Sequence, residues 1–201
     1  KSGVPPPGVL AAMAAILLAR FVIRPAIVPL SVRFGMKPMV IAGTFAAALQ
    51  YLIIPHVHGV DRMLGLLILV SATSDTIYWS TYHAYFAALG DKEHRGQQTS
   101  MREALTALVG IVSPLFTGWV LVTFGPLAAF GVTAVTQALS ALPFLWTPQV
   151  PVARDVTGAF RAALPGVKLF LADGWIGSGT VFLWNMALFL SLKESFLNFG
   201  G

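Results

Sequence analysis

The chain has 201 residues, of which 56% are hydrophobic and 10% are charged, whereas a soluble domain carries about a quarter charged residues. The 13 Lys and Arg residues outnumber the 8 Asp and Glu residues, which gives a net charge of +5. Long apolar runs separated by short charged clusters exclude a water-soluble enzyme and a disordered chain, since neither needs such runs. No basic stripe accompanies the positive charge, so we expect no nucleic-acid partner. The absence of cysteine excludes disulfides and thiolate chemistry.

Six segments are long and apolar enough to cross a bilayer as helices, because a crossing needs roughly 20 residues. They are 9–31, 38–55, 62–88, 99–123, 126–147 and 168–192. A β-barrel would instead have segments of about ten residues with alternating polarity, and the sequence contains none. The prediction is an all-α membrane protein, a polytopic bundle with six transmembrane helices.

The Lys and Arg residues of short loops gather on the cytoplasmic side of a membrane protein. The first, third and fifth connectors (32–37, 89–98 and 148–167), with the helix ends beside them, hold eight cations against three on the opposite face. We therefore expect these connectors in the cytoplasm and a multi-pass protein of the inner membrane, with both ends of this chain outside. The eight cations are Arg33, Lys37, Lys92, Arg95, Arg102, Arg154, Arg161 and Lys168, and the three are Lys1, Arg62 and Lys193.

The fifth connector, 148–167, is the longest, and it contains three prolines and an amphipathic piece around 156–164. A long joint between spans suggests a boundary between two helical bundles. The chain opens with Lys1 instead of Met and ends on two glycines after an apolar stretch. We therefore expect a piece of a longer protein.

The third span contains the polar stretch SATSDTIYWSTYHAYF, with Asp75 near its middle. A charge at that depth costs roughly 2.5–3.5 kcal/mol on insertion scales. The polar and aromatic residues of this stretch share one helix face, which must point into the bundle or a wet cavity, while the other face is Leu, Ile and Ala. Either Asp75 binds a proton or a cationic group in an aromatic pocket, or it is a protonated, structural carboxyl group. The face consists of Ser71, Asp75, Tyr78, Trp79 and Tyr82.

Arg20 and Arg24 lie four residues apart in the otherwise apolar first span. Arginine stays ionised, so it cannot escape the membrane interior by losing its proton. One hypothesis pairs the two side chains with Asp75 or with an anionic substrate. The other extends them toward the cytoplasmic phosphates, which suits Arg24 better than the deeper Arg20.

Residues 28–37, VPLSVRFGMK, resemble the loop after the second helix of the major facilitator superfamily, G-x-x-x-D-R-x-G-R-K. Arg33, Gly35 and Lys37 match this pattern, whereas Val32 stands in place of its aspartate. Two further segments carry the resemblance. Residues 89–100 contain Arg95 followed by glycine, as at the start of that family's fifth helix, and residues 110–118, GIVSPLFTG, resemble the antiporter-type G-x-x-x-G-P-x-x-G-G. Two glycines of that motif are replaced, so antiport is not inferred.

The resemblance implies that the chain spans the second to the seventh of the family's usual twelve helices. Residues 1–147 would form five helices of an N-terminal bundle whose first helix is missing, 148–167 a cytoplasmic linker, and 168–201 the first helix of the C-terminal bundle. The third span would line a central cavity, and cytoplasmic charges would gate it. We expect Asp75, Tyr78, Trp79, Tyr82, Arg20, Arg24, Trp184 and Asn185 to bind substrate, and Arg33, Gly35, Lys37, Arg95 and Pro114 to act in gating.

These expectations predict a monomeric secondary transporter that moves a small solute by alternating access, with no cofactor and no metal. Proton coupling through Asp75 is the favoured mechanism, and facilitated diffusion is the alternative. The two arginines favour an anionic or zwitterionic solute. An intramembrane enzyme using Asp75 and His83 stays open as a rival. So does a transporter-like sensor or assembly protein, because Val32 leaves the loop's charge network incomplete. His56 and His58 lack a third ligand and are a weak metal signal.

Overall fold

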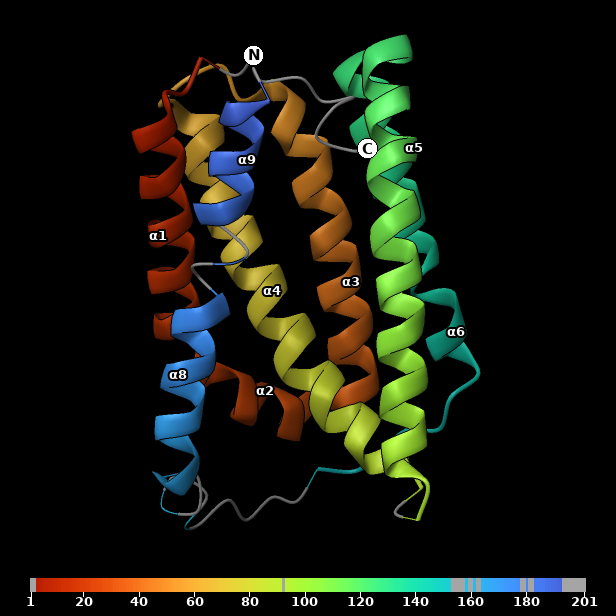
Figure 1. The fold of residues 1–201 in the computed structure, drawn as a ribbon. Coiled ribbons are helices and arrows are strands. Elements are labelled where there is room, and N and C mark those ends of the chain that lie inside the picture. The colour runs from red at the N-terminus through yellow and green to blue at the C-terminus, as the bar shows by residue number, and fades with distance from the viewer. Residues whose placement is uncertain are drawn as a thin grey trace.

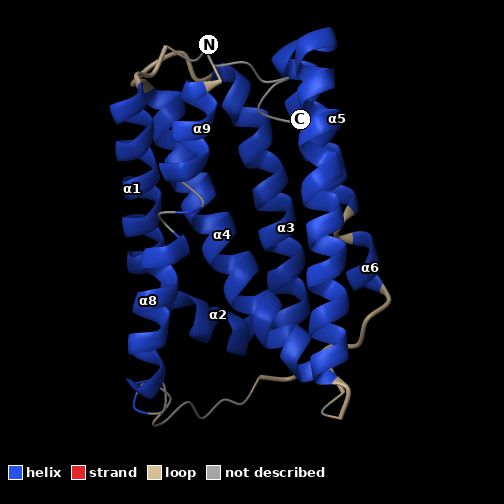
Figure 2. Ribbon diagram, viewed as in Figure 1, coloured by secondary structure: helices blue, strands red, loops and turns tan. Residues whose placement is uncertain are grey.

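A computed structural model describes residues 3–91, 93–152, 158, 161, 164–177, 180 and 183–192. All regular structure in these residues is helical, and none of them forms a strand (Figure 2). The predicted all-α class is confirmed. In chain order the elements are α1 (Pro6–Ile23), η1 (Arg24–Ala26), α2 (Ile27–Phe34), α3 (Met36–Ile53), η2 (Ile54–His56), α4 (Arg62–Leu89), α5 (Arg95–Leu139), α6 (Leu142–Leu145), η3 (Leu164–Gly166), α8 (Val167–Gly177) and α9 (Asn185–Ser191).

The first predicted span, 9–31, is not one straight helix. The α-helical pattern of α1 ends at Ile23, a 3-10 turn follows, and α2 runs obliquely from the lower end of α1 toward α3 (Figure 1). Pro25 explains the break, because it has no N–H to donate to the preceding turn and its ring crowds the carbonyl four residues earlier. The bend places Arg20 on α1 and Arg24 at the corner itself.

Residue 125 separates the fourth and fifth predicted spans, as expected. Gly125 has φ 85° and ψ 175° inside α5, a conformation that glycine adopts far more readily than other residues. Pro126 follows it and cannot donate a backbone hydrogen bond. The chain reverses there, so the two halves of α5 run antiparallel (Figure 1).

The sixth predicted span, 168–192, differs from the expectation of one continuous helix. The structure describes two shorter helices, α8 and α9, and residues 178, 179, 181 and 182 between them lie outside the described part of the chain. Gly174 and Gly177 fall in the second half of α8, where each weakens a helix by roughly 1 kcal/mol relative to alanine.

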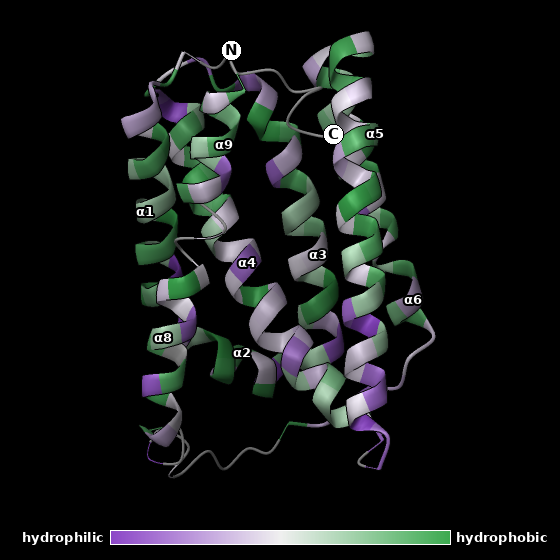
Figure 3. Ribbon diagram, in the orientation of Figure 1, coloured by the Kyte–Doolittle hydropathy of each residue, from purple (hydrophilic) through white to green (hydrophobic). Residues whose placement is uncertain are grey.

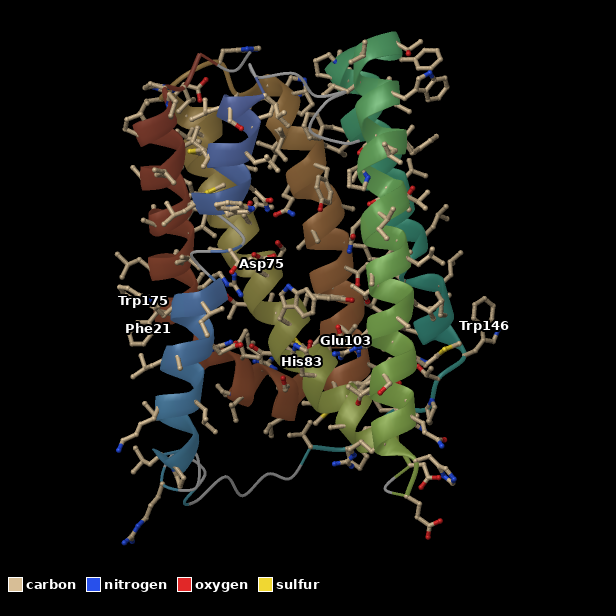
Figure 4. All side chains as sticks on the ribbon, in the orientation of Figure 1. Phe21, Asp75, His83, Glu103, Trp146 and Trp175 are labelled. Atoms are coloured by element: carbon tan, nitrogen blue, oxygen red, sulfur yellow. The ribbon has the colours of Figure 1, made fainter. Side chains whose placement is uncertain are left out.

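Four segments of the described chain are long and apolar enough to span a membrane: Pro6–Phe34, Met36–His56, Arg62–Leu89 and Arg95–Leu145. The last has 51 residues and would be roughly 75 Å long if straight, so its reversal makes two crossings of a hydrocarbon core of about 30 Å. Hydrophobic residues recur along the helices (Figure 3). Large apolar side chains face outward, among them Phe21, Trp146 and Trp175 with 77%, 79% and 85% of their surface exposed (Figure 4). Lipid accommodates such a surface and water does not.

The tightest packing joins α3 to α4. A Cβ atom built on Gly43 of α3 would lie 2.7 Å from the backbone nitrogen of Tyr78 on α4, so only glycine permits this approach. On α4 several small and hydroxyl-bearing residues are each at most 8% exposed: Ser71, Ala72, Ser74, Thr76 and Thr81.

The connectors alternate between the two ends of the bundle as predicted. The α2–α3 and α4–α5 turns and the chain after α6 reach the lower end, while η2 with residues 57–61 and the reversal at Gly125 lie at the upper end (Figure 1). At the upper end Asp61 caps α4 by accepting a hydrogen bond from the Leu64 amide at 2.8 Å, which holds the pKa of Asp61 below its usual value. The assignment of the lower end to the cytoplasm stays a prediction. Of the cations counted for this assignment, Lys92 and Arg154 expected at the cytoplasmic face and Lys1 and Lys193 expected at the opposite face lie outside the described residues, as does most of the piece 156–164.

Candidate functional site

An ion pair joins α1 to α4 inside the membrane-spanning part of the bundle. Nη1 of Arg20 lies 3.4 Å from Oδ2 of Asp75, and the two side chains are 29% and 31% exposed. Asp75 lies at mid-height on α4, above His83 (Figure 4). The hypothesis that pairs Arg20 with Asp75 is therefore confirmed as geometry. Each charge compensates the other where neither is fully solvated.

Aromatic rings continue along α4 from the ion pair toward the lower end. Tyr78 and Tyr82 stack with centroids 5.3 Å apart and planes at 8°, and Tyr82 stacks on Phe86 at 6.2 Å. Trp79 packs edge-on against both tyrosines, at 5.3 Å and 6.1 Å. We call Tyr78, Trp79, Tyr82 and Phe86 the aromatic ladder. Tyr78, Tyr82 and Phe86 lie four apart along the helix and Trp79 lies three residues before Tyr82, so the helical repeat itself brings the rings together.

The residues of the predicted polar face of α4 differ in how far the packing buries them. Tyr78 and Tyr82 are half-buried and Trp79 is 45% exposed, whereas Ser71 is buried. His83, which the enzyme hypothesis pairs with Asp75, stacks on Trp79 with centroids 5.4 Å apart. Among the described residues no group of three or more His, Asp or Glu side chains could hold a metal.

The lower end of the ladder meets α5. The guanidinium of Arg102 lies 5.4 Å from the centre of the Phe86 ring, a cation–π distance, and it also forms an ion pair with Glu103. Tyr82 and Phe86 line a cavity of about 320 Å³, together with Gln98 of α5. From the sequence, Arg102 entered only the charge count, and Glu103 was not among the expected site residues. No spacing rule would have connected them to the ladder.

Arg24 does not share the environment of Arg20. It lines a separate cavity of about 200 Å³ between the start of α2 and the lower part of α4, beside Ser31, Ser80 and Thr81. The two arginines remain one helical turn apart, since the Arg24 amide donates to the Arg20 carbonyl, but Arg24 stands at the corner before α2 while Arg20 pairs with α4. Of the two predicted membrane arginines, the structure brings only Arg20 to Asp75.

The two residues expected on the sixth span lie at the start of α9. Trp184 is 66% exposed and lines a shallow cavity of about 420 Å³ with Trp175, Ile176 and Thr180. Asn185 begins α9 and is exposed. None of the four residues around that cavity belongs to α1 or α4, so Trp184 and the ion pair line different spaces in this structure.

Two expected gating residues, Gly35 and Lys37, contact the end of α6 and the residues that follow it. Nζ of Lys37 donates hydrogen bonds to the carbonyl oxygens of Leu145 and Thr147, at 2.9 Å and 2.8 Å. Gly35 has φ 86°, a backbone angle that glycine adopts far more readily than other residues. A Cβ there would lie 1.8 Å from the side-chain Nε2 of Gln149, but that side chain is exposed and can rotate away, so the backbone angle is what requires the matched glycine.

Tyr85 completes this contact, although the sequence analysis did not select it. Its hydroxyl donates to the carbonyl oxygen of Pro148 at 2.5 Å, with Oγ1 of Thr147 at 2.6 Å, and its side chain is 2% exposed. We call Lys37, Tyr85, Thr147 and Pro148 the lower-end cluster. Its hydrogen bonds join residues 62 to 110 positions apart, so no local pattern could reveal it.

The other three gating candidates lie apart from this cluster. Arg95 donates to the carbonyl oxygen of Ala87 at 3.3 Å, near the end of α4. The guanidinium of Arg33 lies 5.3 Å from the ring centre of Phe34. Pro114 lies within the first half of α5, which continues past it as helix.

These features define a multi-pass helical membrane protein with a charge pair and an aromatic wall inside its bundle. The family model described as Major Facilitator Superfamily matches residues 3–199. The chain therefore belongs to the major facilitator superfamily, a family of secondary transporters and not of enzymes. This confirms the resemblance stated from the loop motifs. No curated protein and no solved structure matches the chain.

Proposed function

We propose that this chain is part of a transporter that moves a small anionic or zwitterionic solute by alternating access, coupled to protons through Asp75. The observation that carries the proposal is the Arg20–Asp75 ion pair at 3.4 Å, placed directly beside the aromatic ladder. A charge pair held by two different helices can be opened from either side by a ligand that replaces one partner. Such a pair is a suitable midplane site for a transporter.

The pair gives the proposed coupling a chemical basis. When a proton binds Asp75, its carboxylate becomes neutral and the guanidinium of Arg20 loses its partner. Arg20 is then free to bind a carboxylate of the solute through paired N–H donors. Loss of the proton restores the competition between Asp75 and the solute for Arg20. Proton and solute therefore bind together in this scheme.

The movement itself is proposed on the family's plan. Residues 1–147 form the N-terminal bundle, 148–167 the linker, and 168–201 the first helix of the second bundle. Rocking of the two bundles would expose the pair to each side in turn. The loop residues Gly35 and Lys37, held against the chain after α6, would keep the lower end of the N-terminal bundle rigid during that movement.

The test uses the full-length protein in proteoliposomes with an imposed pH gradient, and a panel of radiolabelled amino acids and small carboxylic acids. We expect Asp75→Asn to abolish accumulation driven by the gradient and to spare exchange of internal for external solute. Asp61→Asn is the matched control, because it removes a carboxylate outside the span and asparagine still caps a helix. Both activities should survive there. Undiminished accumulation by Asp75→Asn refutes the coupling, and the absence of uptake of any solute by the wild-type protein refutes the transporter.

A further inference from the structure

Arg24 lines its cavity with an exposed side chain, and no described residue compensates its charge. The cavity has a volume of about 200 Å³, several times the roughly 30 Å³ that one water occupies in the liquid. Within the described chain the side chain of Arg24 has neither an ion pair nor a hydrogen bond, in contrast to Arg20. Since arginine keeps its charge at every relevant pH, a guanidinium in such a place favours an anion beside it.

A hydroxyl group in the same cavity also lacks a partner. Oγ of Ser80 is shielded from solvent and has no hydrogen-bond partner in the part of the chain that the structure describes, although Ser80 lines the cavity. The neighbouring α4 hydroxyls of Thr76 and Thr81 donate to carbonyls of their own helix. A buried hydroxyl without a partner is unfavourable, and rotation of the Ser80 side chain about its Cα–Cβ bond would turn Oγ toward the cavity that this residue lines.

The surroundings indicate which anion fits. The rest of the lining is largely apolar, with Val28 and Met36 on one side and Ala84 on the other. The cavity opens near the lower end, where the cation-rich connectors lie. Basic pockets between helices at that level of a membrane hold phosphate head groups.

We propose that this cavity is a binding site for a phosphate group, with the guanidinium of Arg24 as its charge partner and the hydroxyl of Ser80 as a further donor. The phosphate is the phosphodiester of an anionic lipid or a free phosphate ion, which share this chemistry. The site is separate from the Arg20–Asp75 pair and does not depend on the proposed transport reaction. It also gives Arg24 a role that pairing with Asp75 does not.

The experiment measures the melting temperature of the full-length protein in detergent during titration with three probes. Dihexanoyl phosphatidylglycerol carries the phosphodiester, dihexanoylglycerol has the same tails without it, and sodium phosphate supplies the ion alone. A ligand that binds only the folded state stabilises it by an amount that grows with the logarithm of one plus the ratio of ligand concentration to dissociation constant. We expect the melting temperature to rise in this way with phosphatidylglycerol or with phosphate. Stabilisation by the first alone identifies a lipid site, and stabilisation by sodium phosphate identifies a site for the free ion.

Arg24→Gln should weaken that binding by about tenfold or more, because charge-assisted hydrogen bonds are lost. Arg62→Gln is the control, since Arg62 lies at the upper end of α4, and it should bind as the wild type does. Ser80→Ala should leave the melting temperature without ligand unchanged or slightly higher, because it deletes an unsatisfied group, and should weaken binding about fivefold.

Three results would overturn the site. They are equal stabilisation by dihexanoylglycerol, unchanged affinity in both Arg24→Gln and Ser80→Ala, and no stabilisation by any phosphate-containing probe. If Arg24→Gln does not fold, Arg24→Lys replaces it. That variant keeps the charge but loses the planar array of donors, and it should also bind more weakly than Arg62→Gln.

Discussion

Gly43→Ala adds one methyl group where α3 and α4 are closest. The new Cβ would lie 2.7 Å from the backbone nitrogen of Tyr78 and 2.8 Å from its Cα atom. Favourable contacts between carbon atoms begin near 3.5 Å, so the shortfall is about 0.7 Å. The atoms that are struck belong to backbone, which cannot rotate away as a side chain can.

The two helices must therefore separate, and overpacking of this kind costs about 1–3 kcal/mol. Replacing glycine by alanine in a helix also stabilises that helix by up to about 1 kcal/mol, which offsets part of the free energy lost to the clash. Gly65→Ala on α4 corrects for this, because a Cβ there meets nothing within 4 Å. The gain in helix propensity is common to both variants, so the difference between them measures the clash alone.

We expect the full-length Gly43→Ala protein to unfold about 1–3 kcal/mol more easily than Gly65→Ala in an SDS titration followed by circular dichroism. Because the displaced backbone carries Tyr78, one turn from Asp75, uptake should fall in Gly43→Ala and persist in Gly65→Ala. Equal unfolding free energies of the two variants would show that α3 and α4 are not in contact at this point, and the fold described here would be wrong.

Two further predictions concern the lower end. Tyr85→Phe removes the donor to Pro148 and leaves a carbonyl without its partner, so the free energy of unfolding should fall by about 1–3 kcal/mol in the same titration; no change would mean that this hydrogen bond is not formed in the membrane. The hydrogen bond with His94 holds the pKa of Asp91 below its ordinary value of 3.8. Because the folded pKa is the lower one, the stabilisation is complete above pH 3.8 and is lost as the pH falls through the folded value. An NMR titration should place the midpoint of Asp91 below 3.8 in the wild type and closer to 3.8 in His94→Ala, and equal midpoints would contradict the pair.

The sequence predicted the helical class and the position of every reversal between α1 and α6. It could do so because membrane crossing depends on the local length and polarity of a segment, and because Gly125 and Pro126 mark their turn directly. It also singled out Asp75, since an acid in an apolar span is conspicuous without any knowledge of its neighbours.

The candidate site was harder to predict, because its partners come from different helices. Arg20 and Arg24 look equivalent in the sequence, and only the packing shows that Arg20 pairs with Asp75 while Arg24 lines a separate cavity. Trp184 was expected near Asp75, yet the structure places it beside α8 residues. Tyr85 gave no signal at all, since an aromatic residue in a membrane helix is ordinary.

What the sequence alone determined is therefore one-dimensional: which segments enter the lipid, where the chain turns, and which spans carry a charge. What only the tertiary structure decided is which face of each helix meets which neighbour. Small residues such as Gly43 take part in that choice, because the missing side chain lets α3 and α4 approach closely. The packed helices then hold Asp75 within 3.4 Å of Arg20. The physical reason is that helix packing is a property of two surfaces together, and neither surface alone contains it.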